Sequence, residues 1–115
     1  MKLGIEGRRA LIAGSSSGIG AGIAAMLAGE GVEVLVHGRN LAHAEVVVGE
    51  IRAQGGKASI LTGALDVPGE VERLARDALA MGPIDILINS AGATSSARGW
   101  FDVPMMRQAA RLNSL

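Results

Sequence analysis

The chain has 115 residues, no cysteine, and 11 basic residues that balance 11 acidic ones. This length is usual for one domain, and a hydrophobic content of 49% is ample for a packed core. Without cysteine the chain has no disulfides, His37 and His43 alone do not make a metal site, and balanced charge favours neither nucleic acid nor an anionic membrane. Charged residues precede any apolar stretch at the N-terminus, and no apolar run is long enough to span a bilayer, so we expect a cytoplasmic protein.

Short apolar segments alternate with segments of helical periodicity along the whole chain. This alternation is typical of βαβ units and predicts an α/β fold with a parallel sheet. The predicted strands are residues 9–13, 32–37, 58–62 and 84–89.

The first predicted strand runs directly into a glycine-rich turn. Residues 10–20 read Ala-Leu-Ile-Ala-Gly-Ser-Ser-Ser-Gly-Ile-Gly, and an apolar helical pattern follows at once. Such glycines let the chain reverse, let backbone N–H groups approach a pyrophosphate, and let the helix pack close to the strand. The segment therefore predicts a phosphate-binding loop at a helix N-terminus.

Helical periodicity predicts three helices between the strands and a fourth helix after them. The first helix carries an apolar stripe, expected to face the core, made of Ile19, Ile23, Met26 and Leu27. The second begins near Asn40 as N-cap, aligns Ala44, Val47, Val48 and Ile51, and ends at Gly55-Gly56. The third is capped by Asp66 with Pro68 in its first turn, aligns Val67, Val71, Leu74 and Ala78, and stops at Gly82-Pro83. A fourth helix is expected to begin at residues 102–104, after a loop over residues 91–100.

Two spaced motifs occupy matching places in this pattern. The first is Gly-x-x-x-Gly-x-Gly at Gly14, Gly18 and Gly20, and the second is Asn89-Ser90-Ala91-Gly92 after the fourth strand. With these motifs the chain resembles the short-chain dehydrogenase/reductase family, over its whole length but only the N-terminal half of the family's fold. The resemblance implies a Rossmann-type, doubly wound parallel sheet of strand order 3-2-1-4, forming a single dinucleotide-binding domain over residues 1–115. The parent reaction would be hydride transfer between a nicotinamide cofactor and a carbonyl or alcohol.

The resemblance also implies which residues bind the cofactor. Ser16, Ser17 and Ile19 fall where the family contacts phosphates or ribose, alongside the three glycines. Asn89, Ala91 and Gly92 resemble the segment that lines the adenosine ribose. The family's aspartate for adenine aligns with Ala64, and Leu65 beside it is a further candidate contact.

Arg39 bears on the choice between NADP(H) and NAD(H). The second strand ends in His37-Gly38-Arg39-Asn40, about 20 residues after the loop, where NAD-preferring proteins place an acid for the ribose 2′-hydroxyl. Gly38 is no acid, and the Arg39 guanidinium offers donors for a 2′-phosphate. NADP(H) is therefore expected over NAD(H), with a solvated arginine as the simple alternative.

The chain carries little of the family's catalytic set. Asn113 lies where the family has an asparagine that positions a water in its proton relay, together with a serine, a tyrosine and a lysine. There is no tyrosine in the chain, and Lys2 and Lys57 do not follow one. We expect this chain alone to be inactive, and Asn113 to act only when the missing groups complete it.

Two other interpretations stay open. Gly14-Ser15-Ser16-Ser17-Gly18 also fits the Gly-x-Ser-x-Gly elbow of serine hydrolases, although no histidine follows His43. The chain could instead be a non-catalytic nucleotide-binding or subunit-interaction module. In either case we expect the chain to self-associate, through an apolar sheet edge at residues 84–88 or through the fourth helix, because an exposed edge invites pairing.

Overall fold

The computed structural model describes residues 4–64, 66–67 and 69–90. The expectations for Leu65, Ala91, Gly92, Asn113 and the fourth helix lie outside these residues. In chain order the elements are β1 (Arg9–Ala13), α1 (Gly18–Gly29), β2 (Glu33–Gly38), α2 (Leu41–Ala53), β3 (Ala58–Thr62), α3 (Glu70–Ala80) and β4 (Ile86–Asn89). The second and fourth strands thus begin one and two residues later than predicted.

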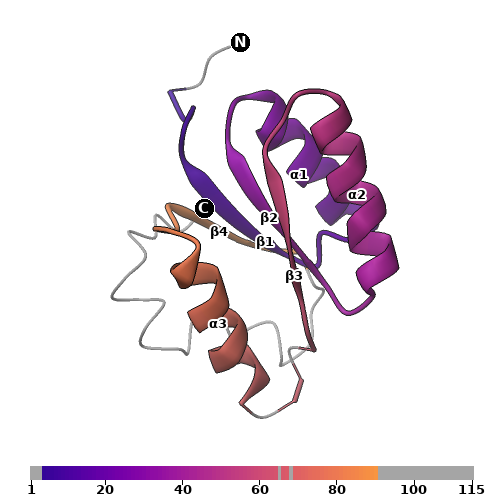
Figure 1. The fold of residues 1–115 in the computed structure, drawn as a ribbon, viewed down its shortest axis with the longest axis vertical. Coiled ribbons are helices and arrows are strands. Elements are labelled where there is room, and N and C mark those ends of the chain that lie inside the picture. Colours follow the sequence, from indigo (N-terminus) through magenta and orange to yellow (C-terminus); the bar gives the residue numbers. More distant parts are fainter. Residues whose placement is uncertain (1–3, 65, 68, 91–115) are drawn as a thin grey trace.

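The described strands form one parallel sheet in the order β3-β2-β1-β4 (Figure 1). Leu11 of β1 is paired with Leu35 of β2 on one side and with Leu87 of β4 on the other. The predicted strand order is confirmed.

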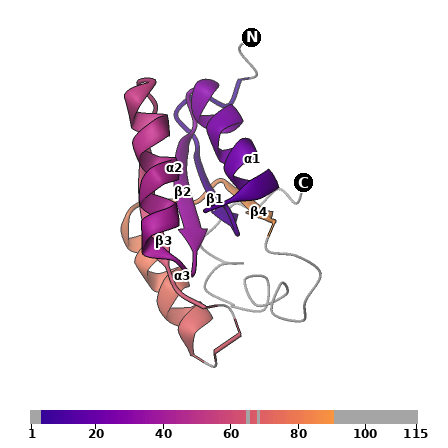
Figure 2. The same ribbon diagram turned by 90° about the vertical axis from the view of Figure 1, so that its right-hand side faces the viewer.

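Helices cover both faces of the sheet, because α3 packs on one face and α1 and α2 pack on the other (Figure 1), the face that is turned to the viewer in Figure 2. The doubly wound arrangement is thus confirmed as well. Successive strand residues point to opposite faces. Leu11 and Ala13 belong to the core under α3, whereas Ala10 and Ile12 belong to the core under α1 and α2.

The face that α1 turns to the sheet differs from the prediction. Its buried residues are Gly20, Ala24 and Ala28, while Ile19 is 80% exposed and Met26 is 63% exposed. Small side chains let the helix backbone approach the sheet closely, and this packing overrides the preference for burying the larger residues. The predicted stripe of Ile19, Ile23, Met26 and Leu27 is therefore not the main core face.

The second helix follows its prediction. Asn40 is the N-cap, and its side-chain oxygen accepts a hydrogen bond from the His43 backbone N–H at 3.0 Å. The buried residues are Ala44, Val47, Val48 and Ile51, as expected.

The third helix begins later than predicted. Its N-cap is Gly69, in the left-handed region with φ 83°, so Asp66 does not cap it. Val67 is 50% exposed, whereas Leu74 and Ala78 are fully buried. Asp66 instead pairs with Arg39, a tertiary contact that local capping signals do not encode.

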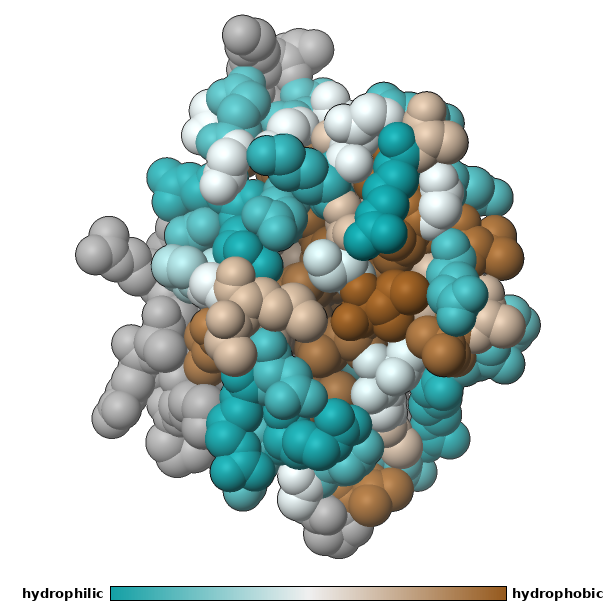
Figure 3. Space-filling model, in the orientation of Figure 1, coloured by the Kyte–Doolittle hydropathy of each residue, from teal (hydrophilic) through white to brown (hydrophobic). Residues whose placement is uncertain are grey.

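Both outer strands of the described sheet present a free edge within the described residues. Apolar residues gather on the surface over β3 (Figure 3), where Ile60 is partly buried. In β4, Ile86 and Ile88 are partly buried and Leu87 is buried, and Ile84 just before the strand is buried too, so the apolar edge expected over residues 84–88 is only partly exposed. None of the helices in the described ranges is long and apolar enough to span a membrane.

Candidate dinucleotide-binding site

The glycine-rich turn joins the carboxyl end of β1 to the first turn of α1. Gly14 and Gly18 have φ values of 75° and 58°, a region that L side chains rarely adopt. A Cβ atom at Gly20 would collide with the Gly14 carbonyl oxygen. The turn therefore requires glycine at Gly14 and Gly18 for its backbone conformation and at Gly20 for space.

The N-terminus of α1 has no side-chain cap. Ser17, the N-cap, makes no side-chain hydrogen bond to the helix backbone, and the first turn contains no acidic residue. Unpaired N–H groups and the partial positive charge of the helix end favour an anion at this position.

The turn also lies at the switch point of the sheet. From β1 the chain proceeds to β2 and β3 on one side, then crosses to β4 on the other. In open α/β sheets, ligands bind at the carboxyl ends of the strands at this point.

A buried hydrogen-bond network holds the turn in place. The Ser15 hydroxyl, which is fully buried, donates to the Ile12 carbonyl oxygen at 2.6 Å and accepts from the His37 backbone N–H at 2.9 Å. The Ser15 N–H donates to the His37 carbonyl oxygen at 2.8 Å. The start of the glycine-rich turn is thus tied to the end of β2.

The His37 side chain extends this network to β3. Its Nδ1 accepts a hydrogen bond from the Gly14 N–H at 3.1 Å, and its Nε2 lies 3.0 Å from the Gly63 carbonyl oxygen. These partners assign a neutral imidazole with the proton on Nε2. Burial lowers the pKa of His37, partly opposed by the hydrogen bond to Gly63.

Ser16 packs against Gly38, the last residue of β2, in the space that a side chain at Gly38 would fill. A Cβ atom added to Gly38 would lie 2.6 Å from the Ser16 Cβ and closer still to its hydroxyl oxygen. Arg39 comes next and is 68% exposed, with its Nη2 atom 2.7 Å from Asp66 Oδ1. The loop serine and the arginine therefore flank the same strand end.

The described candidate residues gather at the carboxyl edge of the sheet. Asn89 is paired in register with Ala13 of β1, beside the loop. The sequence did not predict that Ser15 and His37 hold the glycine-rich turn in place, or that Asp66 pairs with Arg39. The one available signal was a polar serine and histidine adjoining two otherwise apolar strands.

The serine hydrolase interpretation lacks a base in this geometry. Both ring nitrogens of His37 are engaged by backbone groups of Gly14 and Gly63, so neither is left to accept a proton from Ser16.

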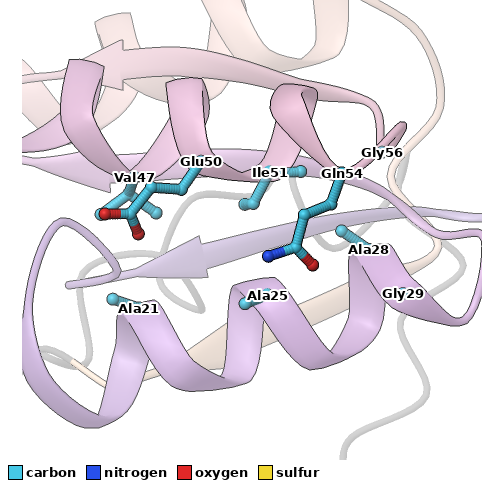
Figure 4. Close-up of a pocket in the computed structure, with 9 residues that line it drawn as sticks. All are labelled: Ala21, Ala25, Ala28, Gly29, Val47, Glu50, Ile51, Gln54 and Gly56. Carbon is cyan, nitrogen blue, oxygen red and sulfur yellow. The ribbon is translucent and has the colours of Figure 1, made fainter.

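A pocket of about 130 Å³ lies elsewhere, between α1 and α2 (Figure 4). Ala21, Ala25 and Val47 line it, and the side chains of Glu50 and Gln54 extend across the gap between the helices. None of its lining residues belongs to the glycine-rich turn.

The strand order, the glycine turn at the switch point and the helices on both faces of the sheet define a Rossmann-type fold. Residues 8–111 match the family model of the short chain dehydrogenases. The chain therefore belongs to the short-chain dehydrogenase/reductase family.

Relatives of known sequence or structure agree with this membership. The chain is 36% identical over 104 residues to an uncharacterized oxidoreductase of Bacillus subtilis, covering 90% of this chain and 39% of that protein. It is 42% identical over 91 residues to gluconate 5-dehydrogenase of Gluconobacter oxydans, covering 76% of this chain and 35% of that enzyme. A 3-oxoacyl (acyl-carrier-protein) reductase from Agrobacterium tumefaciens, solved with NADP bound, superposes with a TM-score of 0.76 at 36% identity, covering 91% of this chain and 47% of that one. The chain thus spans less than half the length of these relatives.

Proposed function

We propose that this chain is the NADP(H)-binding part of an oxidoreductase that transfers hydride between the cofactor and a carbonyl or alcohol. The observation that carries the proposal is the Gly14–Gly20 turn, which opens at an uncapped helix N-terminus at the switch point of the sheet. Such a place combines backbone donors, positive potential and room for a pyrophosphate.

Each candidate residue has a proposed role. Backbone groups of the turn bind the pyrophosphate, and Ser16, Ser17 and Ile19 contact phosphate or ribose through side chains or backbone N–H groups. Asn89 lines the adenosine ribose. The same role is proposed for Ala91 and Gly92, and an adenine contact for Leu65.

Arg39 supports the preference for NADP(H). It follows β2 directly, and Gly38 before it offers no carboxylate to repel a 2′-phosphate. Two structural relatives carry this cofactor: the reductase from Agrobacterium tumefaciens has NADP bound, and a gluconate 5-dehydrogenase from Burkholderia cenocepacia, 35% identical, is in complex with NADP and tartrate.

The chain supplies binding rather than complete chemistry. A proton donor near the substrate carbonyl needs a tuned pKa and hydrogen-bond reach, and the chain contains no tyrosine for that task. We propose that it binds and orients the cofactor without turnover, and that Asn113 takes part in catalysis only when the family's missing groups are supplied.

Calorimetric titration with NADPH and, in parallel, NADH tests this function. Saturable binding with NADPH tighter is expected, and Arg39→Ala should weaken NADPH binding by about tenfold or more because a charge-assisted hydrogen bond is lost. If the chain binds neither NADPH nor NADH, the proposed function is refuted. Unchanged NADPH affinity in Arg39→Ala would refute only the role of Arg39.

We also propose that copies of this chain associate. Within the described residues, β4 pairs with β1 alone, and Ile86 and Ile88 are only partly buried. The exposed Ile19 and Met26 lie on the flank of α1 that is turned away from the α2-facing residues Ala21 and Ala25. An open strand edge and exposed apolar side chains each favour association.

A further inference from the structure

The Arg39 guanidinium, which the proposed function assigns to binding the 2′-phosphate, is paired with the Asp66 carboxylate in this structure. Arg39 Nη2 and Asp66 Oδ1 are 2.7 Å apart, and the two side chains are 68% and 56% exposed. An exposed pair is accessible to a ligand and is weak enough to be exchanged. Any anion that binds this guanidinium therefore meets the Asp66 carboxylate.

The backbone holds these two residues near each other. Gly38 and Thr62 are paired in register at the ends of β2 and β3, and the Gly63 N–H donates to the Gly38 carbonyl oxygen at 3.2 Å. Arg39 and Asp66 leave the sheet from these adjoining strand ends. Their proximity thus follows from strand pairing and not from side-chain reach alone.

We propose that Asp66 is a specificity-determining residue that competes with the cofactor 2′-phosphate for Arg39 and so limits the preference for NADP(H). The proposal rests on the proposed function. To bind the phosphate, Arg39 must either release Asp66 or hold two anions side by side, and like charges at this separation repel. NADH presents a neutral 2′-hydroxyl at this position and does not meet that repulsion.

The prediction concerns the ratio of two affinities. Asp66→Asn removes the charge but keeps the size of the side chain, and its position on the surface should leave folding intact. NADPH affinity should rise about fivefold at low ionic strength, from one charge–charge repulsion in water, and the gain should shrink at about 0.5 M salt. NADH affinity should stay within about twofold, because a neutral hydroxyl meets no such repulsion.

A matched control separates this competition from net charge. Glu72 is an exposed acid on α3, for which the described part of the chain shows no ion pair. Glu72→Gln changes the net charge by the same amount and should leave both affinities unchanged. The double variant Arg39→Ala/Asp66→Asn should bind NADPH no tighter than Arg39→Ala alone.

The measurement is calorimetric titration of all four variants and the parent chain with NADPH and NADH. If Asp66→Asn leaves the ratio of NADPH affinity to NADH affinity unchanged, the proposed competition for Arg39 is wrong. The same holds if Asp66→Asn raises this ratio equally in the Arg39→Ala background. In both cases the proposed function stands. If the parent chain binds neither cofactor, the proposed function fails, and this inference fails with it.

Discussion

Single residues in and beside the turn between β1 and α1 are constrained by space more than by hydrophobicity. Gly20 is the clearest case, since its missing side chain makes room for the Gly14 carbonyl group. By contrast, a Cβ atom at Gly22, one position further along α1 than Ala21, would meet nothing within 4 Å. The same helix therefore contains a glycine that is required and one that is not.

Gly20→Ala should both destabilise the chain and abolish nucleotide binding. Overpacking at such a site costs about 1–3 kcal/mol, and the displaced loop would no longer present its N–H groups. Gly22→Ala should instead stabilise the chain by about 0.5–1 kcal/mol, because alanine is the better helix former. Urea unfolding and NADPH titration check both variants, and equal effects of the two would contradict the steric argument.

Because the His37 side chain is buried, we predict that the folded chain loses stability in mild acid. Burial lowers its pKa in the folded chain below the ordinary value of 6.5, so the unfolded chain binds a proton more readily. Its contribution is thus complete above pH 6.5 and is lost as the pH falls through the folded-state pKa. Protonation of Nδ1 would also remove the acceptor for the Gly14 N–H.

The urea midpoint measured from neutral pH down to about pH 5 checks this dependence, above the range in which carboxylates titrate. The His37→Asn variant should be less stable than the parent chain at neutral pH. Its urea midpoint should fall much less than that of the parent chain as the pH is lowered over this interval. His43→Asn is the control, because His43 is exposed on α2 and should leave the decline unchanged. A parent chain whose midpoint does not move over this interval would contradict the role given to His37.

Among the elements, those with local signals were predicted well. The N-cap of α2 is Asn40, as the sequence indicates, and its buried stripe follows the helical period. The strand order could be predicted because the glycine turn and the Asn-Ser-Ala-Gly segment together resemble one family.

Other features depend on tertiary contacts and could not be predicted. The core face of α1 is set by small residues that allow close approach, which hydrophobic periodicity does not reveal. The Asp66–Pro68 signal predicts a cap, but Gly69 takes that position and Asp66 pairs with Arg39. The His37 contacts join three strand ends, and no local pattern encodes such a network.

The cap of α2 gives a test at the scale of one element. Asn40→Ala removes the hydrogen bond to the His43 N–H and should lower the free energy of unfolding by about 1 kcal/mol. Asn40→Asp keeps an acceptor and adds a charge that suits the helix N-terminus, so stability should be retained. Urea unfolding distinguishes the two, and equal losses would mean that the side-chain cap does not contribute.

At the scale of the whole molecule, the exposed flank of α1 that carries Ile19 and Met26 should govern association. Met26→Lys places a charge on that flank and should weaken self-association by about tenfold, since it replaces buried apolar area at an interface. Val46 on α2 is similarly exposed, at 59%, so Val46→Lys should have little effect. Sedimentation equilibrium measures both, and a parent chain that stays monomeric would refute the proposed association.

The strand pairings also imply an order of assembly. The hydrogen bond from the Gly14 N–H, directly after β1, to His37 of β2 closes a loop of 23 residues, whereas the hydrogen bond between Arg9 and Asp85, just before β4, closes one of 76. Because longer loops cost more entropy to close, the three strands β1, β2 and β3 should pair before β4 docks. The proposed nucleotide site combines groups at the ends of β1, β2 and β4, so it should be complete only after β4 has docked, and a nucleotide bound there would stabilise the docked state by mass action.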